Sequence, residues 1–519
     1  MSVRVRYAPS PTGSPHVGNI RDALFKHLLA KHFGGVNILR IEDTDRTRFV
    51  PGAIEEIIES LQWLGIEWQE GFGKGGPHGP YLQSERQAAG IYEREIKKLL
   101  DSGAAYWAFD TPEELEEMRQ FQQVNKQPIG YFGGEWRDAS EAKRKEARSK
   151  GLPGVIRLKV PRNQSISIED FIRGRIEWDS NTVDDPVLIK ADGMPTYHFA
   201  AMVDDHLMGI THIMRGEEWI SSAPKHAVLF DAFGWERPVF VHCPVIKGPD
   251  GSKLSKRHGD TRCLDFRSAG YLPEALANFI ALIGWSPKDD REVLSREELI
   301  EAFTLDGIQP APGIFDAEKL KWLNSIRIRD LSPDQLLQTV SSFLSEADTS
   351  AYWSDTETHP DREETNKTLE LLRQAVTETP EYAAETLKLE QERVKTLAEF
   401  GPASEFFFVE TPHYEEKAVQ KWFGKPHVLE LFDAADAWLA GKSEVSTEDC
   451  EEFVRGMGAE KEEEWSLGGK LGPIVHPLRV AFTGKTAGPG LFELMALLGP
   501  ERMSHRLATA RNHLFTQEG

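Results

Sequence analysis

The N-terminal apolar pattern changes period several times, and each change predicts a new element. Val3, Val5 and Tyr7 alternate with arginines, which predicts a short strand. Apolar residues then recur at helical spacing across residues 24–33, and a glycine pair ends that run. A second apolar run at residues 36–41 predicts another buried strand, followed by a further helix pattern. Strand–helix–strand–helix order predicts a parallel, doubly wound sheet.

The pattern differs in the later parts of the chain. Residues 83–190 are rich in Glu, Lys, Gln and Gly and contain short strand patterns, as expected of a domain inserted into the sheet domain. Strand patterns resume after this stretch, and from about residue 273 amphipathic helical runs dominate. We therefore expect an α/β doubly wound (Rossmann-like) domain with an inserted α+β domain, followed by an all-helical C-terminal region.

Composition narrows the class of protein. The 519 residues are too many for one core, so several domains are expected. The three cysteines, Cys243, Cys263 and Cys450, have no metal-finger spacing and suit a reducing compartment. Without a leader pattern or a membrane-length apolar run, we expect a cytoplasmic protein with no membrane partner. The net charge of -22 argues against nonspecific nucleic-acid binding, although a local basic track could still bind RNA.

The turn between the first strand and the first helix contains candidate chemistry. Prolines stiffen residues 8–15, and His16 and Gly18 follow at the predicted helix N-terminus, where amide groups favour anions. This is no Walker A loop, because Asn19 and Ile20 stand where Lys and Ser or Thr are required, and no dinucleotide fingerprint follows the strand. A proline-rich connection with one structural histidine is the alternative.

A second candidate lies far downstream. Residues 248–257 combine mobile glycines with three cations, Lys253, Lys256 and Arg257, and follow a late strand pattern. Such a loop can close on a triphosphate and stabilise the charge on departing pyrophosphate. An ordinary solvated basic turn is the alternative, which the pairing with the His16 turn disfavours.

Together these segments resemble the two signature motifs of the class I aminoacyl-tRNA synthetases, and specifically the glutamyl-tRNA synthetase family. The matching segments are Arg6-Tyr7-Ala8-Pro9-Ser10-Pro11-Thr12-Gly13, His16-Val17-Gly18-Asn19 and Lys253-Leu254-Ser255-Lys256-Arg257. Further ordered matches lie at residues 40–45, 79–86, 195–198, 203–209, 215–219 and 477–481. The resemblance thus covers nearly the whole chain.

The resemblance implies an L-glutamate pocket. Its expected lining residues are Arg6, Ala8, Ser10, Glu42, Tyr197 and Arg215. Glu42 would hold the substrate ammonium group, and Arg6 and Arg215 would bind carboxylate. The charge of Arg215 favours glutamate over glutamine. The alternatives are a strand-edge surface charge for Arg6 and a structural ion pair with Glu217 or Glu218 for Arg215.

The resemblance also implies an ATP site and a tRNA partner. The expected ATP contacts are His16, Gly18, Asn19, Ser255 and Lys256. His16, Lys253 and Lys256 are the expected catalytic residues, and Mg²⁺ would enter bound to ATP. Arg48 is a candidate contact to tRNA(Glu). Arg393 is a weaker one, since a solvated surface role fits it nearly as well.

The same resemblance assigns roles to the parts of the chain. The expected divisions are a catalytic domain in two halves (1–82 and 191–250), an inserted acceptor-end-binding domain (83–190), a stem-contact region with the lysine loop (251–330) and a helical anticodon-binding domain (331–519). A monomer is the family-level expectation.

The sequence departs from its relatives at three places. Asn19 stands where the broad class often has His. Ala108, Asp110 and Trp136 stand near where some relatives have zinc-binding cysteines, so no structural zinc is expected. Ala201 stands where some relatives have a polar residue, which leaves the details of the amino-acid pocket open.

The function implied is glutamate–tRNA ligation: L-glutamate is activated with ATP and transferred to the 3′ end of tRNA(Glu). Alternatives are a glutaminyl enzyme, a non-discriminating enzyme that also charges tRNA(Gln), a shortened relative that modifies a tRNA base, and an inactive RNA-binding scaffold. The roughly 200 helical residues after Asn324 argue against the shortened relative. The sequence does not decide between discriminating and non-discriminating activity.

Overall fold

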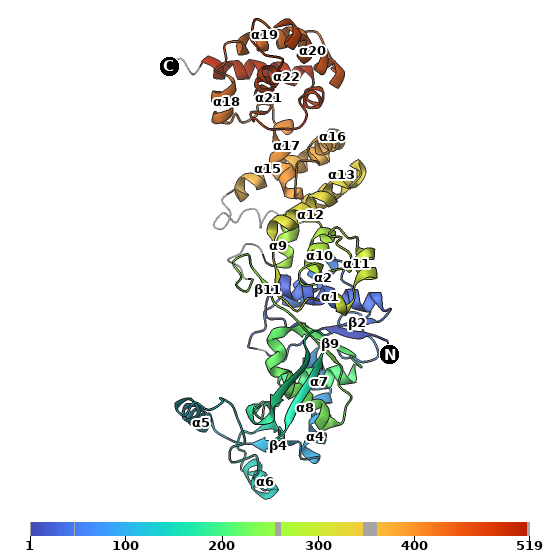
Figure 1. Ribbon diagram of the computed structural model, residues 1–519, viewed down its shortest axis with the longest axis vertical. Helices are drawn as coiled ribbons and strands as arrows, with labels where there is room; N and C mark the ends of the chain where they lie inside the picture. The colour runs from blue at the N-terminus through green and yellow to red at the C-terminus, as the bar shows by residue number, and fades with distance from the viewer. Residues whose placement is uncertain (1, 46, 255–260, 346–360, 516–519) are drawn as a thin grey trace. The chain divides into compact units, whose positions relative to one another are not determined.

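The computed structural model describes residues 2–45, 47–254, 261–345 and 361–515. They form two compact units, one from Met1–Leu264 and Leu276–Asp316 and the other from Asp265–Ala275 and Ala317–Gly519 (Figure 1). Each unit is described by itself below.

A parallel sheet begins the first unit. Its strands are β1 (Arg4–Tyr7), β2 (Val36–Leu39) and β3 (Glu70–Gly71). In the register, Arg6 pairs with Ile38, and every pairing in this sheet is parallel. The helices that follow β1 and β2 are α1 (Val17–His32) and α2 (Ala53–Trp63). The predicted strand–helix–strand–helix order is therefore confirmed, with α1 starting earlier than its apolar run.

A second sheet is mixed. Its members, in spatial order, are β7 (Gly174–Asp179), β6 (Ser165–Asp170), β10 (Val239–Cys243) and β9 (His212–Gly216). The β6–β10 and β10–β9 pairs are parallel, and the β6–β7 pair is antiparallel. Strands β9 and β10 are parallel and are connected through α8 (Ala223–Phe233), while α7 (Tyr197–Leu207) precedes β9. The amide of Thr211, just before β9, donates to the Arg4 carbonyl at 2.9 Å, so β9 begins beside β1. This brings the carboxyl ends of β1 and β9 to the same edge, where ligands of open α/β sheets bind.

A small antiparallel sheet lies within the stretch predicted as an insertion. Its strands are β4 (Ala105–Ala108), β5 (Val155–Leu158) and β8 (Val187–Ile189). The helices of this stretch are α3 (Gln83–Ala88), α4 (Ile91–Asp101), α5 (Pro112–Val124) and α6 (Glu141–Ser149). Thr111 caps α5 through a reciprocal side-chain and backbone pair with Glu114, and Pro112 fits the first turn. The stretch has the mixed α and β character predicted for it, but its strands β6 and β7 join the sheet of β9 and β10, and the domain division stays a prediction.

From residue 246 onward, the described residues are helical apart from two short strands. These strands, β11 (Ile246–Lys247) and β12 (Gly313–Ile314), pair in parallel. The helices between and after them are α9 (Cys263–Ser268), α10 (Pro273–Ala281), α11 (Arg296–Ala302), α12 (Ala317–Arg329), α13 (Pro333–Ser345), α15 (Arg362–Glu378), α16 (Pro380–Glu390), α17 (Phe400–Phe408), α18 (Glu416–Trp422), α19 (Val428–Leu439), α20 (Thr447–Glu460), α21 (Gly472–Thr483) and α22 (Leu491–Phe515). Short 3₁₀ helices are η1 (Ser180–Thr182), η2 (Glu217–Ser222), η4 (Leu305–Gly307) and η5 (Leu397–Glu399). The predicted helical C-terminal region is confirmed.

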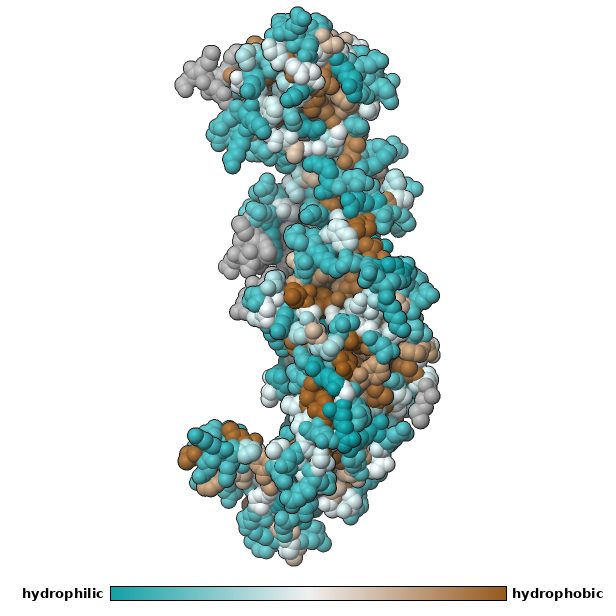
Figure 2. Space-filling view, in the orientation of Figure 1, coloured by the Kyte–Doolittle hydropathy of each residue, from teal (hydrophilic) through white to brown (hydrophobic). Residues whose placement is uncertain are grey.

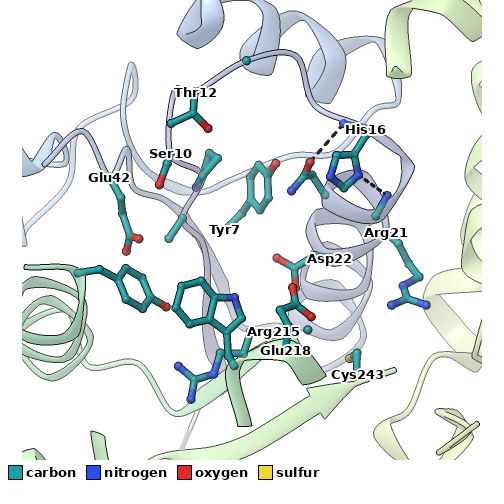
Figure 3. A pocket seen from close by; sticks show the side chains of 18 of the residues that line it. Tyr7, Ser10, Thr12, His16, Arg21, Asp22, Glu42, Arg215, Glu218 and Cys243 are labelled. Carbon is teal, nitrogen blue, oxygen red and sulfur yellow. Dashed lines mark hydrogen bonds between the residues drawn. The ribbon is translucent and has the colours of Figure 1, made fainter. Parts of the chain in front are cut away.

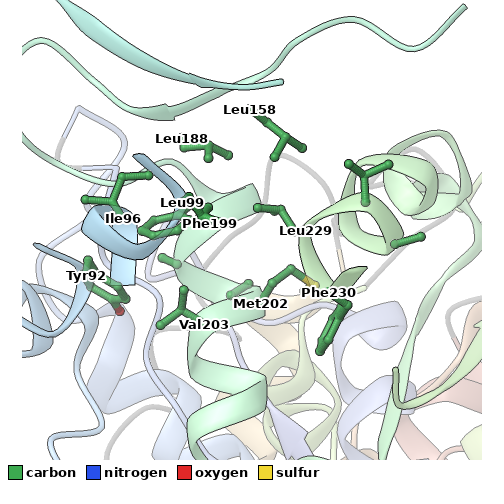
Figure 4. Packing of buried hydrophobic residues seen from close by; sticks show 14 of the residues in the cluster. Tyr92, Ile96, Leu99, Leu158, Leu188, Phe199, Met202, Val203, Leu229 and Phe230 are labelled. Carbon is green, nitrogen blue, oxygen red and sulfur yellow. The ribbon is translucent and has the colours of Figure 1, made fainter. Parts of the chain in front are cut away.

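Each unit has its own hydrophobic core. In the first unit, α4, α7 and α8 pack on the strands through buried residues that include Tyr92, Leu99, Phe199 and Leu229 (Figure 4). In the second unit, α18 to α22 share a separate cluster of buried side chains. The α7–α8 packing matters for function, because it fixes the helix faces that point toward the ends of β9 and β10.

The visible surface is predominantly polar, with apolar residues in scattered groups (Figure 2). Among the described residues, no helix is both long enough and apolar enough to cross a lipid bilayer.

Candidate active site

A cleft of about 1300 Å³ opens at the carboxyl ends of β1 and β9. Figure 3 shows Glu42 and Ser10 on one side of it, His16 on another and Arg215 below them. The cleft is lined by residues from every candidate segment that the structure describes: Arg6, Ala8, Ser10, His16, Gly18, Asn19, Glu42, Arg48, Tyr197, Arg215 and Lys253. Ser255 and Lys256 lie outside the described residues.

His16 and Asn19 cap the first turn of α1. The His16 imidazole Nδ1 accepts a hydrogen bond from the Gly18 amide at 3.1 Å, and Asn19 Oδ1 accepts from the His16 amide at 3.2 Å. Since Nδ1 accepts, the neutral ring has its proton on Nε2. Burial, together with the Lys253 cation, lowers the pKa of His16. A neutral His16 can therefore donate from Nε2 to a phosphate or ring acceptor.

Gly18 makes this cap possible. A side-chain carbon at residue 18 would lie 3.0 Å from Cε1 of His16, closer than ordinary packing allows. The glycine therefore leaves room for the imidazole as well as for a ligand at the helix N-terminus.

The backbone ties the downstream loop to the His16 turn. The Val17 amide donates to the Thr261 carbonyl at 2.9 Å, and the Cys263 amide donates to the Pro15 carbonyl at 3.0 Å. On the other side of the loop, Lys253 is exposed and lines the same cleft. The two signature segments, more than 230 residues apart in sequence, therefore meet at one site.

One wall of the cleft is a network of buried opposite charges, here named the Arg6 wall: Arg6, Arg40, Glu42, Asp204 and Asp205. Arg6 Nε donates to Asp205 Oδ1 at 2.9 Å, and Arg40 Nη1 lies 2.8 Å from the same oxygen. Burial lowers the pKa of Arg6, but the Asp205 carboxylate more than offsets this, and the net pKa is raised. Arg6 is 3% exposed, so it is not a strand-edge surface charge.

Glu42 belongs to this wall but faces the cleft. Its Oε1 accepts from Arg40 Nη2 at 2.9 Å. Burial raises the pKa of Glu42, while the cations of Arg40 and Arg6 act in the opposite direction. A substrate ammonium group would add a further cation, which favours the carboxylate form that the predicted role requires.

The opposite wall, here named the Arg215 wall, comprises Arg215, His226, His242 and Asp170. Arg215 is 5% exposed and hydrogen-bonds two imidazoles, His242 Nε2 at 3.1 Å and His226 Nδ1 at 2.9 Å. Within the described residues, Arg215 forms no ion pair with Glu217 or Glu218, and Glu217 instead binds Arg173 at 2.5 Å. The structural ion pair weighed for Arg215 is thus absent from the described residues.

The remaining candidates lie between these walls or at the rim. Tyr197 begins α7 and packs on Trp219 with ring centroids 4.4 Å apart, and burial raises the pKa of its phenol. Ser10 is exposed and Ala8 half-buried on the turn. Arg48 is exposed at the rim, where its Nε lies 2.7 Å from Asp45 Oδ2. Arg393 lies in the second unit, 3.4 Å from Glu390.

The structure shows the contacts of Asp110 and Trp136 and the burial of Ala201, which stand at two of the places where the sequence departs from its relatives. Tyr131 donates to Asp110 at 2.8 Å, and Trp136 packs edge-on against Phe109. Ala201 is fully buried in α7. Within the described ranges, no group of three or more His, Cys, Asp or Glu side chains is arranged to hold a metal ion.

Sequence reasoning missed the residues that orient the two arginines. Arg40 and Asp205 lie inside matched segments, so their position beside predicted site residues was a usable signal. His226 and His242 have no local motif, and only the tertiary fold brings His226 of α8 and His242 of β10 to Arg215 of β9.

Comparisons with known proteins agree with this geometry. A family model for the catalytic domain of class I tRNA synthetases (E and Q) matches residues 2–322, and one for an anticodon-binding domain matches residues 334–511. The fold and the cleft therefore define a class I tRNA synthetase of the glutamate and glutamine group.

The individual relatives are more specific. The chain is 41% identical to a glutamate–tRNA ligase of Desulforudis audaxviator, over 98% of this chain and 96% of the relative. It is 42% identical to a glutamate–tRNA ligase of Thermus thermophilus, over 98% of this chain and 99% of the relative. A crystal structure of a glutamate tRNA ligase from Elizabethkingia meningosepticum in complex with its amino acid superposes with a TM-score of 0.84 at 35% identity, covering 99% of both chains. The chain belongs to the glutamate–tRNA ligase family.

Proposed function

We propose that this protein activates L-glutamate with ATP and transfers it to the 3′ end of tRNA(Glu). The observation that supports this best is the meeting of two arginines and one glutamate with the His16 turn in a single cleft. A dicarboxylic amino acid presents two carboxylates and one ammonium group, which match Arg6, Arg215 and Glu42 in charge.

The proposed chemistry has two steps. The substrate α-carboxylate oxygen attacks the α-phosphorus of ATP, a new O–P bond forms, and the bond to the β-phosphate breaks to release pyrophosphate. A terminal ribose hydroxyl of tRNA then attacks the adenylate carbonyl and AMP leaves. The first step needs positioning and charge stabilisation more than a protein base.

The roles of the ATP-site residues remain part of the proposal. His16, Gly18 and Asn19 lie at the N-terminus of α1, where amide groups and the helix dipole favour phosphate. Lys253 lies at the rim of the same cleft. Ser255 and Lys256 are assigned from the sequence alone. Mg²⁺ would arrive with ATP, and Arg48 would contact tRNA. A monomeric, cytoplasmic enzyme and the five-part domain division also remain predictions.

ATP–pyrophosphate exchange with glutamate, measured with and without tRNA(Glu), tests the function. We expect glutamate-dependent exchange, whereas its absence under both conditions would favour the inactive RNA-binding scaffold. Charging of purified tRNA(Glu) and tRNA(Gln) with glutamate, and each with glutamine, then separates discriminating, non-discriminating and glutaminyl enzymes.

A variant tests the phosphate role of the lysine loop. Lys256→Ala should slow exchange by about 10²-fold or more, because the departing pyrophosphate loses a cation. Binding of tRNA, measured by filter retention, should stay close to that of the unaltered protein. Unchanged exchange kinetics would refute the role of Lys256.

A further inference from the structure

The Arg215 side chain is held by neutral rings where a buried arginine would ordinarily meet a carboxylate. Arg215 and His242 lie opposite each other in the register of β9 and β10, and His226 reaches Arg215 from α8. Arg215 Nε donates to His242 Nε2 at 3.1 Å, and Nη1 bonds His226 Nδ1 at 2.9 Å. His226 and His242 are both fully buried.

The bonding pattern fixes the protonation of each ring. Arginine can only donate, so His242 Nε2 and His226 Nδ1 must both be acceptors. His242 Nδ1 then has the proton and donates to Asp170 Oδ2 at 2.6 Å. His226 Nε2 has the proton and donates to His198 Nδ1 at 3.0 Å. A second proton on either buried ring would place an N–H against the guanidinium.

The electrostatic surroundings favour these neutral forms. Burial and the Arg215 cation together lower the pKa of His226 well below its usual value. Burial lowers the pKa of His242, although its bond to Asp170 acts in the opposite direction. Asp170 lies beyond His242, and its Oδ1 is occupied by the amides of residues 172 and 173. No carboxylate is hydrogen-bonded to Arg215 in the described part of the chain.

The third nitrogen of the Arg215 guanidinium, Nη2, is the one that neither imidazole binds. By hydrogen-bond geometry Nη2 is buried without a partner among the described residues, although the Tyr197 hydroxyl interacts with the Arg215 guanidinium, and Arg215 lines the cleft. A buried donor without a partner is costly, so this site is built to receive an acceptor from a ligand. Arg6 differs, since its Nε is already bound to the Asp205 carboxylate.

We propose that His226 and His242 are specificity-determining positioning residues, which hold Arg215 through neutral acceptors and leave its charge for the side-chain carboxylate of the substrate. This deepens the function proposed above and rests on it. Glutamate supplies the missing anion, whereas the glutamine amide leaves the buried cation without a counterion. If a protein carboxylate were hydrogen-bonded to Arg215 in place of the imidazoles, the Arg215 cation would no longer distinguish glutamate from glutamine.

A matched pair of substitutions at His226 tests the proposal. His226→Gln keeps a neutral acceptor for Arg215 and a donor for His198, whereas His226→Glu adds a carboxylate at the same place. ATP–pyrophosphate exchange with tRNA(Glu) present gives kcat and KM for glutamate and for glutamine. We expect His226→Glu to lower the glutamate-to-glutamine ratio of kcat/KM by about tenfold or more, mainly through KM for glutamate. His226→Gln should keep that ratio within about threefold.

Control variants separate the effect of a negative charge beside Arg215 from a general effect of substitution on the enzyme. His32→Glu and His32→Gln make the same changes at the end of α1, outside the residues that line the cleft, and should leave the ratio unchanged. KM for ATP should also be unaltered in the His226 variants. Equal ratios for His226→Glu and His226→Gln would overturn the proposal. Absence of exchange in the unaltered protein would instead refute the proposed function.

A second pair keeps the test decisive if His226→Glu does not fold. His242→Gln and His242→Glu make the same comparison at Arg215 Nε, and the acidic variant should again lose glutamate preference. If the ratio is unchanged by both His242 variants, the neutral rings do not determine specificity.

Discussion

The two walls of the cleft hold the same kind of residue in opposite electrostatic settings. Arg6 and Arg215 are both almost fully buried, at 3% and 5% exposure. The Asp205 carboxylate raises the pKa of Arg6 against the effect of burial, whereas burial leaves the pKa of Arg215 lowered. Both arginines of the Arg6 wall are therefore paired with carboxylates inside the wall. In the Arg215 wall the one carboxylate, Asp170, is bonded to His242 and to the amides of residues 172 and 173, so Arg215 itself has no carboxylate hydrogen-bonded to it among the described residues.

The largest expected effect comes from breaking the Arg6 wall. Asp205→Asn would leave Arg6 and Arg40 without their shared carboxylate, and removing one partner of a buried pair costs about 3–5 kcal/mol. Urea unfolding of the full chain, followed by a signal from the first unit, measures this loss. The matched control is Asp231→Asn at the exposed pair with Arg237, which should cost less than about 1 kcal/mol. If Asp205→Asn and Asp231→Asn lost the same free energy of unfolding, the Asp205 carboxylate would not be a buried counterion of Arg6 and Arg40.

Breaking the Arg215 wall should affect the substrate more than stability. Arg215→Ala removes a cation that has no carboxylate partner, so no buried anion is stranded. We expect kcat/KM for glutamate to fall about 10- to 100-fold, with reduced discrimination against glutamine. Exchange kinetics with both amino acids provide the measurement. A loss of unfolding free energy as large as that of Asp205→Asn, with unchanged discrimination, would indicate a purely structural arginine.

Acid should also separate His198, which is hydrogen-bonded to His226 beside the Arg215 wall, from the carboxylates of the Arg6 wall. Burial, with a contribution from Lys225, lowers the pKa of His198 to about 4, below the value of 6.5 expected when unfolded. The unfolded chain therefore binds this proton first, and stability falls as pH drops from about 6.5 to about 4, by on the order of 1 to 3 kcal/mol. Asp205, whose folded pKa is lowered, should lose its contribution only below about pH 4.

Unfolding at several pH values compares His198→Gln with the unaltered protein. The variant should show a weaker loss of stability over this interval, since it has no proton to take up there. Parallel pH profiles for the two proteins would show that His198 does not titrate as expected.

The smallest effect is expected at the rim, outside both walls. Arg48 is exposed and paired only with Asp45, so Arg48→Ala should leave the unfolding midpoint unchanged. If Arg48 contacts a tRNA phosphate, KM for tRNA should rise a few-fold, and the slope of log affinity against log salt should weaken by about one unit. Aminoacylation at several salt concentrations measures both, and an unaltered salt slope would remove Arg48 from the tRNA contacts.

Sequence by itself determined the local parts of this protein. Alternating and helical apolar periods placed β1, α1 and β2, because each pattern reflects contacts within a few residues. The His16 turn was also recognisable, since its prolines, cap and glycine are adjacent in the chain. Ordered motifs indicated the family and most of the candidates that line the cleft.

Tertiary structure decided what those residues are bonded to. Whether Arg215 had an ion pair with Glu217 or was held by His226 and His242 depended on the packing of α8 and β10 against β9. Likewise, Arg6 reaches Asp205 across 199 positions of sequence. Burial and hydrogen-bond partners set the charge state of such groups, and both arise only when distant segments pack together.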